Sequence, residues 1–262
     1  FAAPAPALGG PPTAALEAAR RAAEEGGASF ETEERWYSVQ LGGTRAGWMM
    51  ERVEEGGGRI VTESEMELSI RRGGMPITIR FDSRFVETEG HEPIEMTVTH
   101  KLGAMPDTQR YVFRDDGTIA RTIVRRGQRH EGEIDAPEEA WLTPGAVAER
   151  VRAAIEQGEE SFSVRMVQPM GEFAIVETAY ERVGEAAVEV LGREVPGIEW
   201  KTTVDAYPGV EATEYTDRKG RTVRTTTVMG TLRFEMRLAD EALAKADVDP
   251  PELLKRTLVE PG

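Results

Sequence analysis

Histidine and carboxylate side chains are the residues of this sequence that could do acid–base or metal chemistry. The three histidines are His91, His100 and His130, and no two of them have the spacing that places a histidine pair on one helix face for zinc. His100 continues an alternating apolar run, so we interpret it as a core or edge residue. The sequence therefore predicts neither a catalytic nor a metal-binding histidine.

Three glutamates, Glu63, Glu65 and Glu67, alternate along one predicted strand and could offer a carboxylate row to calcium. The expected pairing of this strand places arginines opposite two of them, which favours a solvated strand face. The sequence contains no calcium loop rich in Asp and Asn. Its 47 acidic residues also make some glycosidase-like carboxylate pair inevitable, so that enzyme class is neither supported nor excluded.

Other catalytic signatures are missing from the sequence. There is no Gly-x-Ser-x-Gly nucleophile elbow, no Gly-rich phosphate loop and no dinucleotide fingerprint. Because the chain has no cysteine, it has no thiolate nucleophile, no disulfide and no cysteine-ligated zinc. We therefore expect this chain not to be an enzyme, with no catalytic residue, no metal site and no cofactor.

The ten methionines indicate a different kind of site. Methionine adapts its shape to irregular cores and to apolar ligands alike. One strong helix cannot cover the apolar face of roughly fourteen strands, the number estimated from the turn signals. Part of that face could therefore curl around a ligand or meet a partner, and the candidate apolar ligand face consists of Met66, Phe81, Met96, Phe234 and Met236.

Length and charge limit the classes of partner. The chain has 262 residues, of which 39% are hydrophobic and 30% charged, which suits a globular protein. Its formal net charge of −15 argues against nucleic acid and anionic membrane surfaces as partners. No stretch approaches the roughly 20 apolar residues that span a bilayer, so we predict no membrane span.

Alternating apolar residues dominate from Trp36 onward and predict a long antiparallel meander with one apolar face. The clearest hairpin runs from Arg59 to Val86 around a two-residue turn at Gly73-Gly74. The register set by this turn places apolar residues opposite apolar residues on one face and acidic residues opposite arginines on the other. The predicted pairs are Ile70–Ile77, Leu68–Ile79, Met66–Phe81, Glu67–Arg80 and Glu63–Arg84.

A similar hairpin is expected at the start of the meander. A turn at Gly42-Gly43 sets Tyr37 opposite Trp48 and Val39 opposite Ala46. At the other end, Leu232, Phe234, Met236 and Leu238 share one face, with Arg233, Glu235 and Arg237 opposite.

Helix signals interrupt the meander at one strong point and at its ends. Thr143 to Gly158 has a threonine N-cap, proline at the first helical position and a terminal glycine. A weak helix is predicted at Thr13–Glu25, and short helices at Asp240–Ala246 and Pro250–Val259.

The central helix separates two halves that resemble each other. Gly117 to Gly127 matches Gly220 to Gly230 in the spacing of Gly, Arg and Thr, which favours an internal duplication. The predicted divisions are 1–30 as a lead with a weak helix, 31–136 as the first β half, 137–160 as the connecting helix, 161–240 as the second β half and 241–262 as a helical segment or linker. Whether the halves form one sheet or two packed layers stays open from the sequence.

Three segments carry a family resemblance. They are Trp36-Tyr-x-Val-x-Leu-Gly-Gly-x-x-x-Gly47-Trp48, Glu214-Tyr215-x-Asp217-x-x-Gly220-Arg221-x-Val223-Arg224 and Leu238-Ala239-Asp240-Glu241-Ala242-Leu243. Their order resembles the N-terminal β-rich extracytoplasmic region that precedes the catalytic domain in bacterial transglutaminase-like proteins. The resemblance implies an antiparallel exported module in the periplasm or outside the cell. It implies no catalytic residue here, because that catalytic domain uses Cys, His and Asp and this chain has no cysteine.

Two hypotheses of function follow from the sequence. The first is a non-catalytic exported module that binds or positions a ligand or partner, ahead of a transglutaminase-like domain in a longer protein. The second is a carrier or sensor of an apolar ligand such as a lipid or acyl chain.

Overall fold

The computed structural model describes residues 31–102, 105–168 and 173–252, and its strands form one fourteen-stranded antiparallel sheet. The predicted mainly β fold with a single long helix is confirmed. The first eight strands are β1 (Glu31–Leu41), β2 (Thr44–Gly56), β3 (Arg59–Arg72), β4 (Met75–Thr88), β5 (Pro93–Lys101), β6 (Asp107–Phe113), β7 (Thr118–Arg125) and β8 (Gln128–Asp135).

The second half follows the helix α2 (Pro144–Gln157). Its strands are β9 (Ser161–Val167), β10 (Ile175–Val190), β11 (Arg193–Val204), β12 (Glu211–Asp217), β13 (Thr222–Met229) and β14 (Leu232–Ala239), and the short helix α3 (Glu241–Lys245) comes last. The segments Gly117–Gly127 and Gly220–Gly230 both form a turn, a strand and a turn. A common origin of the halves, and the predicted division into segments, stay predictions.

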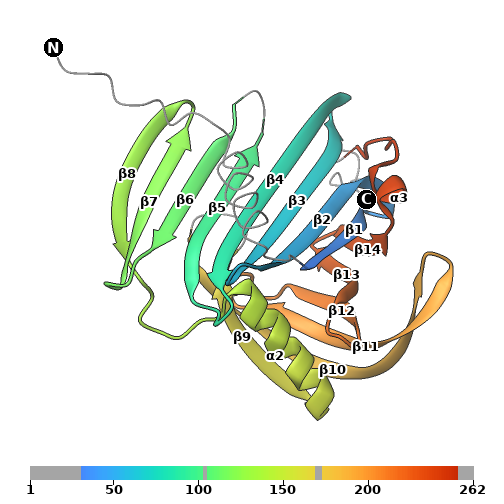
Figure 1. Ribbon diagram of the computed structural model, residues 1–262. Coiled ribbons are helices and arrows are strands. Elements are labelled where there is room, and N and C mark those ends of the chain that lie inside the picture. Colours follow the sequence, from blue (N-terminus) through green and yellow to red (C-terminus); the bar gives the residue numbers. More distant parts are fainter. Residues whose placement is uncertain (1–30, 103–104, 169–172, 253–262) are drawn as a thin grey trace.

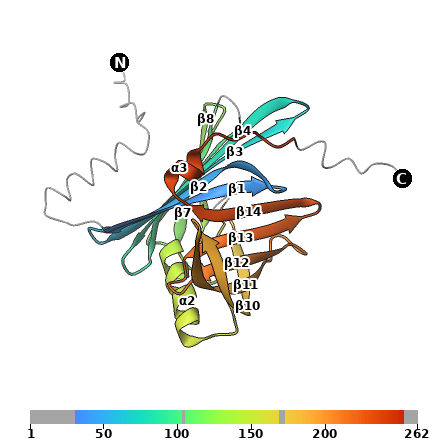
Figure 2. The ribbon, with the colours of Figure 1, turned by 90° about the vertical axis from the view of Figure 1, so that its right-hand side faces the viewer.

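One pairing joins the two halves. The first strand, β1, lies antiparallel to the last, β14, with Val39 opposite Met236, so the sheet order runs from β8 through β1 and β14 to β9. Figure 2 shows these two strands side by side in the middle of the molecule. The halves therefore form one continuous sheet and not two separate layers.

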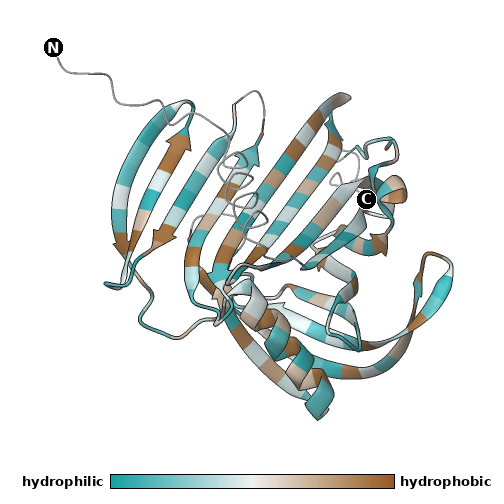
Figure 3. Ribbon diagram, viewed as in Figure 1, coloured by the Kyte–Doolittle hydropathy of each residue, from teal (hydrophilic) through white to brown (hydrophobic). Residues whose placement is uncertain are grey.

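Hydrophilic and hydrophobic residues alternate along many strands, as the banding in Figure 3 shows, which fits side chains that point alternately to the two faces of a sheet. The predicted hairpin of Arg59 to Val86 is confirmed: β3 and β4 pair around Gly73-Gly74, with every predicted apolar and charged pair in register. Only the ion pairs differ in detail, because Arg80 contacts Glu65 at 2.7 Å rather than Glu67 directly opposite.

The predicted register of the first hairpin is wrong by one residue. Tyr37 lies opposite Met49, and Trp48 lies opposite Ser38 on the other face. The cause is a β-bulge after Val39, which skips Ala46 and sets Val39 opposite Gly47. Trp48 therefore packs with Trp36 on the outer face, with ring centroids 5.4 Å apart and the ammonium of Lys245 4.2 Å from the Trp36 ring.

The sheet curls until its second half packs on its first. Val167 of β9 belongs to one buried cluster with Phe85, Met96 and Tyr111, although β9 and β6 lie far apart in the sheet order. The Phe173 N–H also donates to the Tyr111 hydroxyl at 3.1 Å. The inner face of the sheet is therefore enclosed by packing between strands that share no ladder.

Helix α2 lies against the inner face of the second half (Figure 1). Val151 and Ala154 of its apolar stripe pack on Trp200, and Gly158 ends the helix in the left-handed conformation, as predicted. The predicted helical cap is only partly right. Thr143 occupies the N-cap position, but its side chain does not cap the helix and donates instead to Glu87.

The predicted terminal helices have different outcomes. Helix α3 is confirmed, with the Asp240 carboxylate accepting from the Leu243 N–H at 2.6 Å. The helix predicted to begin at Pro250 does not begin there, because residues 250–252 are not helical and Glu252 bridges to Arg71. The rest of that segment, and the weak helix at Thr13–Glu25, lie outside the described residues.

Candidate functional site

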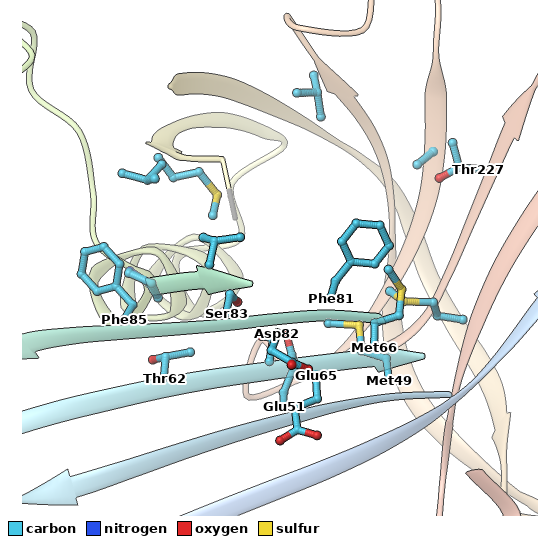
Figure 4. Close-up of a pocket in the computed structure, with 18 of the residues that line it drawn as sticks. Met49, Glu51, Thr62, Glu65, Met66, Phe81, Asp82, Ser83, Phe85 and Thr227 are labelled. Atoms are coloured by element: carbon cyan, nitrogen blue, oxygen red, sulfur yellow. The ribbon is translucent and has the colours of Figure 1, made fainter. Parts of the chain in front are cut away.

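The inner face of the curled sheet encloses a cavity of about 610 Å³, which we call the lumen. Strands from both halves form its walls, as the side chains in Figure 4 show. The first half contributes mainly Met49, Met66, Phe81, Phe85, Met96 and Val98, and the second half contributes Thr202, Val204, Val210, Ala212, Thr227, Phe234 and Met236. A cavity of this volume lined mostly by apolar side chains is typical of small-molecule sites, which span about 300–1,000 Å³.

All five residues of the predicted apolar ligand face line the lumen, namely Met66, Phe81, Met96, Phe234 and Met236. Strand alternation was the signal that found them, because each sits on the apolar face of a well-marked strand. Part of the second-half wall was missed. It includes Thr202, Ala212 and Thr227, whose small or polar side chains look like those of a solvated strand, and only the register of β11–β14 could have indicated them.

Two half-exposed side chains, Tyr207 and Met229, line the lumen where β11 and β13 end. Antiparallel pairing places these strand ends at the same end of the sheet as the Gly42-Gly43 and Gly73-Gly74 turns. This end is therefore the mouth of the lumen. Leu142 and Pro144, just before and at the start of α2, line it from another side.

A group of polar side chains lies on the inner face between the halves. The Tyr37 hydroxyl lies 3.2 Å from a Glu51 carboxylate oxygen and 3.1 Å from the Thr222 carbonyl oxygen. The Thr222 hydroxyl donates to Glu214 at 2.7 Å. These contacts connect β2 and β1 with β13 and β12, passing over β14.

Burial disfavours the ionised forms of Glu214 and Tyr37 in this group. Burial raises the pKa of Glu214, and the nearby Glu51 carboxylate raises it further, against the opposing effect of the Thr222 hydrogen bond. Burial, followed by the charge of Glu51, also raises the pKa of Tyr37 well above its usual range. The only cation with a short contact here among the described residues is Arg35, 3.4 Å from Glu51. Of this group, Glu51 lines the lumen, and its carboxylate oxygens can accept hydrogen bonds from a ligand there.

A second buried carboxylate holds the start of α2. Glu87 of β4 is fully buried; it accepts the Gly145 N–H at 2.8 Å and the Thr143 hydroxyl proton. His91 Nδ1 lies 2.7 Å from Glu87, and His91 Nε2 lies 3.2 Å from Glu149 of the helix. This group could not be predicted from the sequence, because its members come from a strand and a turn and from a helix that lies far from them in the chain.

The other residues considered for chemistry do not converge. His100 packs edge-on against Phe81, and His130 is exposed on the edge strand β8. Glu65 pairs with Arg80 on the outer face, where both side chains are partly exposed, as predicted for a solvated strand face. Glu63 lies 3.5 Å from Arg84, but both of these side chains are mostly buried, so the prediction is only partly right. Within the part of the chain that the structure describes, no group of three or more His, Asp or Glu side chains could hold a metal ion. None of the described helices is long and apolar enough to cross a bilayer.

Comparison with known proteins supports the fold. No family model and no curated protein matches this chain. A solved structure, the crystal structure of a β-barrel-like protein of the domain of unknown function DUF1849 from Brucella abortus, superimposes with a TM-score of 0.60. The match covers 79% of this chain and 95% of that one at 12% identity. At this identity the likeness shows a shared curved β fold.

Proposed function

We propose that this chain is a non-catalytic binding module that carries or senses an apolar ligand, such as a lipid or an acyl chain, in the lumen. The observation that carries the proposal is the cavity of about 610 Å³ walled by methionine, phenylalanine and valine side chains from both halves. A well-packed β core leaves few voids larger than a water molecule. A cavity of this size is therefore better explained as a ligand site than as a packing defect.

The methionines support an apolar and adaptable ligand. Met49, Met66, Met96 and Met236 line the lumen together, and flexible thioether side chains can repack around chains of different length. The half-exposed Tyr207 and Met229 line the lumen at its mouth and present apolar surface to an entering ligand.

Native mass spectrometry of gently purified protein tests this function. We expect a population with extra mass that disappears on extraction with organic solvent, and saturable binding of a fluorescent lipid analogue by the stripped protein. A protein that carries no extra mass and binds no lipid analogue would contradict the proposal.

The wider setting of the module rests on the sequence resemblance alone. We propose that the module is exported and acts ahead of a transglutaminase-like catalytic domain. The motifs around Trp36 and Gly220 support this, and sequencing the gene beyond the codon for Gly262 tests it. A following reading frame with Cys, His and Asp in a transglutaminase-like pattern is expected, and an immediate stop codon would contradict it.

A further inference from the structure

The lumen is layered along its length. Met49 lies opposite Met66, and Met66 lies opposite Phe81, which gives one apolar row across β2, β3 and β4. All three side chains line the lumen, and Figure 4 shows them close together, with Thr227 on the facing wall. This row is the one nearer the mouth, because these positions are nearer the Gly42-Gly43 and Gly73-Gly74 turns.

The next inward-facing row is polar. Glu51 lies opposite Ser64, and Ser64 lies opposite Ser83, so the row crosses the same three strands one step deeper. All three residues line the lumen. A ligand that enters from the mouth therefore meets apolar side chains first, and then a row that holds the Glu51 carboxylate followed by the Ser64 and Ser83 hydroxyls.

The carboxylate of this row belongs to an acceptor-rich group. Glu51 is held by the Tyr37 hydroxyl, which also contacts the Thr222 carbonyl oxygen, and Glu214 lies close enough for its charge to be disfavoured by that of Glu51. Arg35 at 3.4 Å offsets part of the Glu51 charge. An anionic head group in the lumen would lie beside the Glu51 carboxylate, with Glu214 close to it, whereas a donor head group would be matched by the Glu51 oxygens.

From this layering we propose that the ligand is an amphiphile whose polar end is a hydrogen-bond donor without negative charge, an amine or a hydroxyl, which contacts Glu51 while its apolar tail lies along Met49, Met66 and Phe81. This inference rests on the proposed function and adds the chemical class of the ligand. An unmodified fatty acid is thereby a poor ligand at neutral pH.

Competition between three ligands with the same tail tests this inference. Dodecylamine, dodecanol and dodecanoate would each displace a fluorescent lipid analogue from the full chain at neutral pH. We expect the amine and the alcohol to displace it at concentrations at least about tenfold lower than dodecanoate, since one lost buried hydrogen bond or one charge repulsion is worth about that factor.

Two variants with the same change of charge locate the effect. Glu51→Gln keeps an acceptor for the Tyr37 hydroxyl, and it should reduce the preference for the amine over dodecanoate by about tenfold. Glu67→Gln, on the outer face of β3, should leave the preference unchanged.

The results of these experiments distinguish a wrong ligand class from a wrong proposed function. Equal displacement by all three ligands, tighter binding of dodecanoate or an unchanged preference in Glu51→Gln would overturn the inference and leave the proposed function standing. If the protein binds neither the fluorescent analogue nor any of the three ligands, the proposed function fails and this inference fails with it.

Discussion

The Glu87 carboxylate accepts the Gly145 N–H at 2.8 Å and so joins strand β4 to the first turn of α2, 58 residues later in the chain. The first N–H groups of a helix have no partner within the helix. The buried Glu87 carboxylate accepts a hydrogen bond from one of them here. Its negative charge also interacts favourably with the positive end of the helix dipole. This contact holds the start of the helix beside the lumen, which Pro144 lines.

Removing this carboxylate should loosen the helix. Glu87→Ala leaves the Gly145 N–H and the Thr143 hydroxyl without their acceptor in a buried place, so we expect a loss of about 2–4 kcal/mol in the free energy of unfolding. Urea denaturation followed by circular dichroism measures it. Glu92→Ala, an exposed change nearby, should stay within about 0.5 kcal/mol of the parent. Equal losses in both variants would contradict the anchoring role.

His91 should make stability depend on pH in the opposite sense to a carboxylate. Burial disfavours its charge, but hydrogen bonds to Glu87 and Glu149 outweigh this and raise the pKa of His91 above its usual 6.5. The contribution of His91 to the free energy of unfolding is therefore fully present below about pH 6.5. It is lost as the pH rises through the raised pKa of His91 in the folded state.

The variant His91→Asn isolates this effect, because asparagine tolerates the positive φ of 64° at this position. Unfolding free energies should differ most between parent and variant at about pH 5.5 and converge towards about pH 9. The exposed His130→Asn serves as control and should show no such convergence. A pH-independent difference for His91→Asn would rule out the charged contact.

Glu235 should be a source of stability on the outer face of β14. It is 4% exposed, and Arg224 lies 2.8 Å and Arg233 3.4 Å from its carboxylate, which Arg237 also contacts. Burial acts to raise the pKa of Glu235, but the hydrogen bond from Arg237 and the charges of the three arginines outweigh it, so the pKa is lowered below 4.5.

Glu235→Gln should therefore cost about 1–3 kcal/mol at neutral pH. The parent's advantage is present above about pH 4.5 and falls as the pH drops through the lowered folded-state pKa. Thermal unfolding across this range measures it, with the exposed Glu189→Gln as control. If the parent became more stable relative to Glu235→Gln as the pH falls, the lowered pKa of Glu235 would be contradicted.

Gly47 should tolerate no side chain. A Cβ there would lie 1.8 Å from the Glu67 carbonyl oxygen, which is backbone of the neighbouring strand and cannot move aside. Gly47→Ala should cost about 3 kcal/mol or more. Gly184→Ala, where no atom lies within 4 Å of the new methyl group, should change stability by less than about 1 kcal/mol. Similar melting temperatures for the two variants would contradict the close approach.

The sequence indicated local pairs much better than distant ones. The β3–β4 hairpin could be predicted residue by residue, because Gly73-Gly74 fixes the turn and both faces agree on one register. The β1–β2 register could not, because the bulge after Val39 leaves the apolar pattern almost intact while it shifts the pairing by one residue.

The lumen was half predictable for a related reason. Met66 and Phe81 could be assigned to an apolar face from alternation alone, but the wall opposite them depends on the β1–β14 pairing, which no local signal encodes. Glu87 was missed in the same way. In the sequence it is one glutamate among many, and its burial comes from a helix that follows much later.

A pair of tryptophan substitutions tests whether the lumen holds the ligand. Ala212→Trp fills the lumen from β12, and Ala179→Trp places the same side chain on the exposed outer face of β10. Both variants would be titrated with a fluorescent lipid analogue after circular dichroism confirms their fold. We expect at least about tenfold weaker binding for Ala212→Trp and unchanged binding for Ala179→Trp. Undiminished binding by a folded Ala212→Trp variant would contradict a ligand site in the lumen.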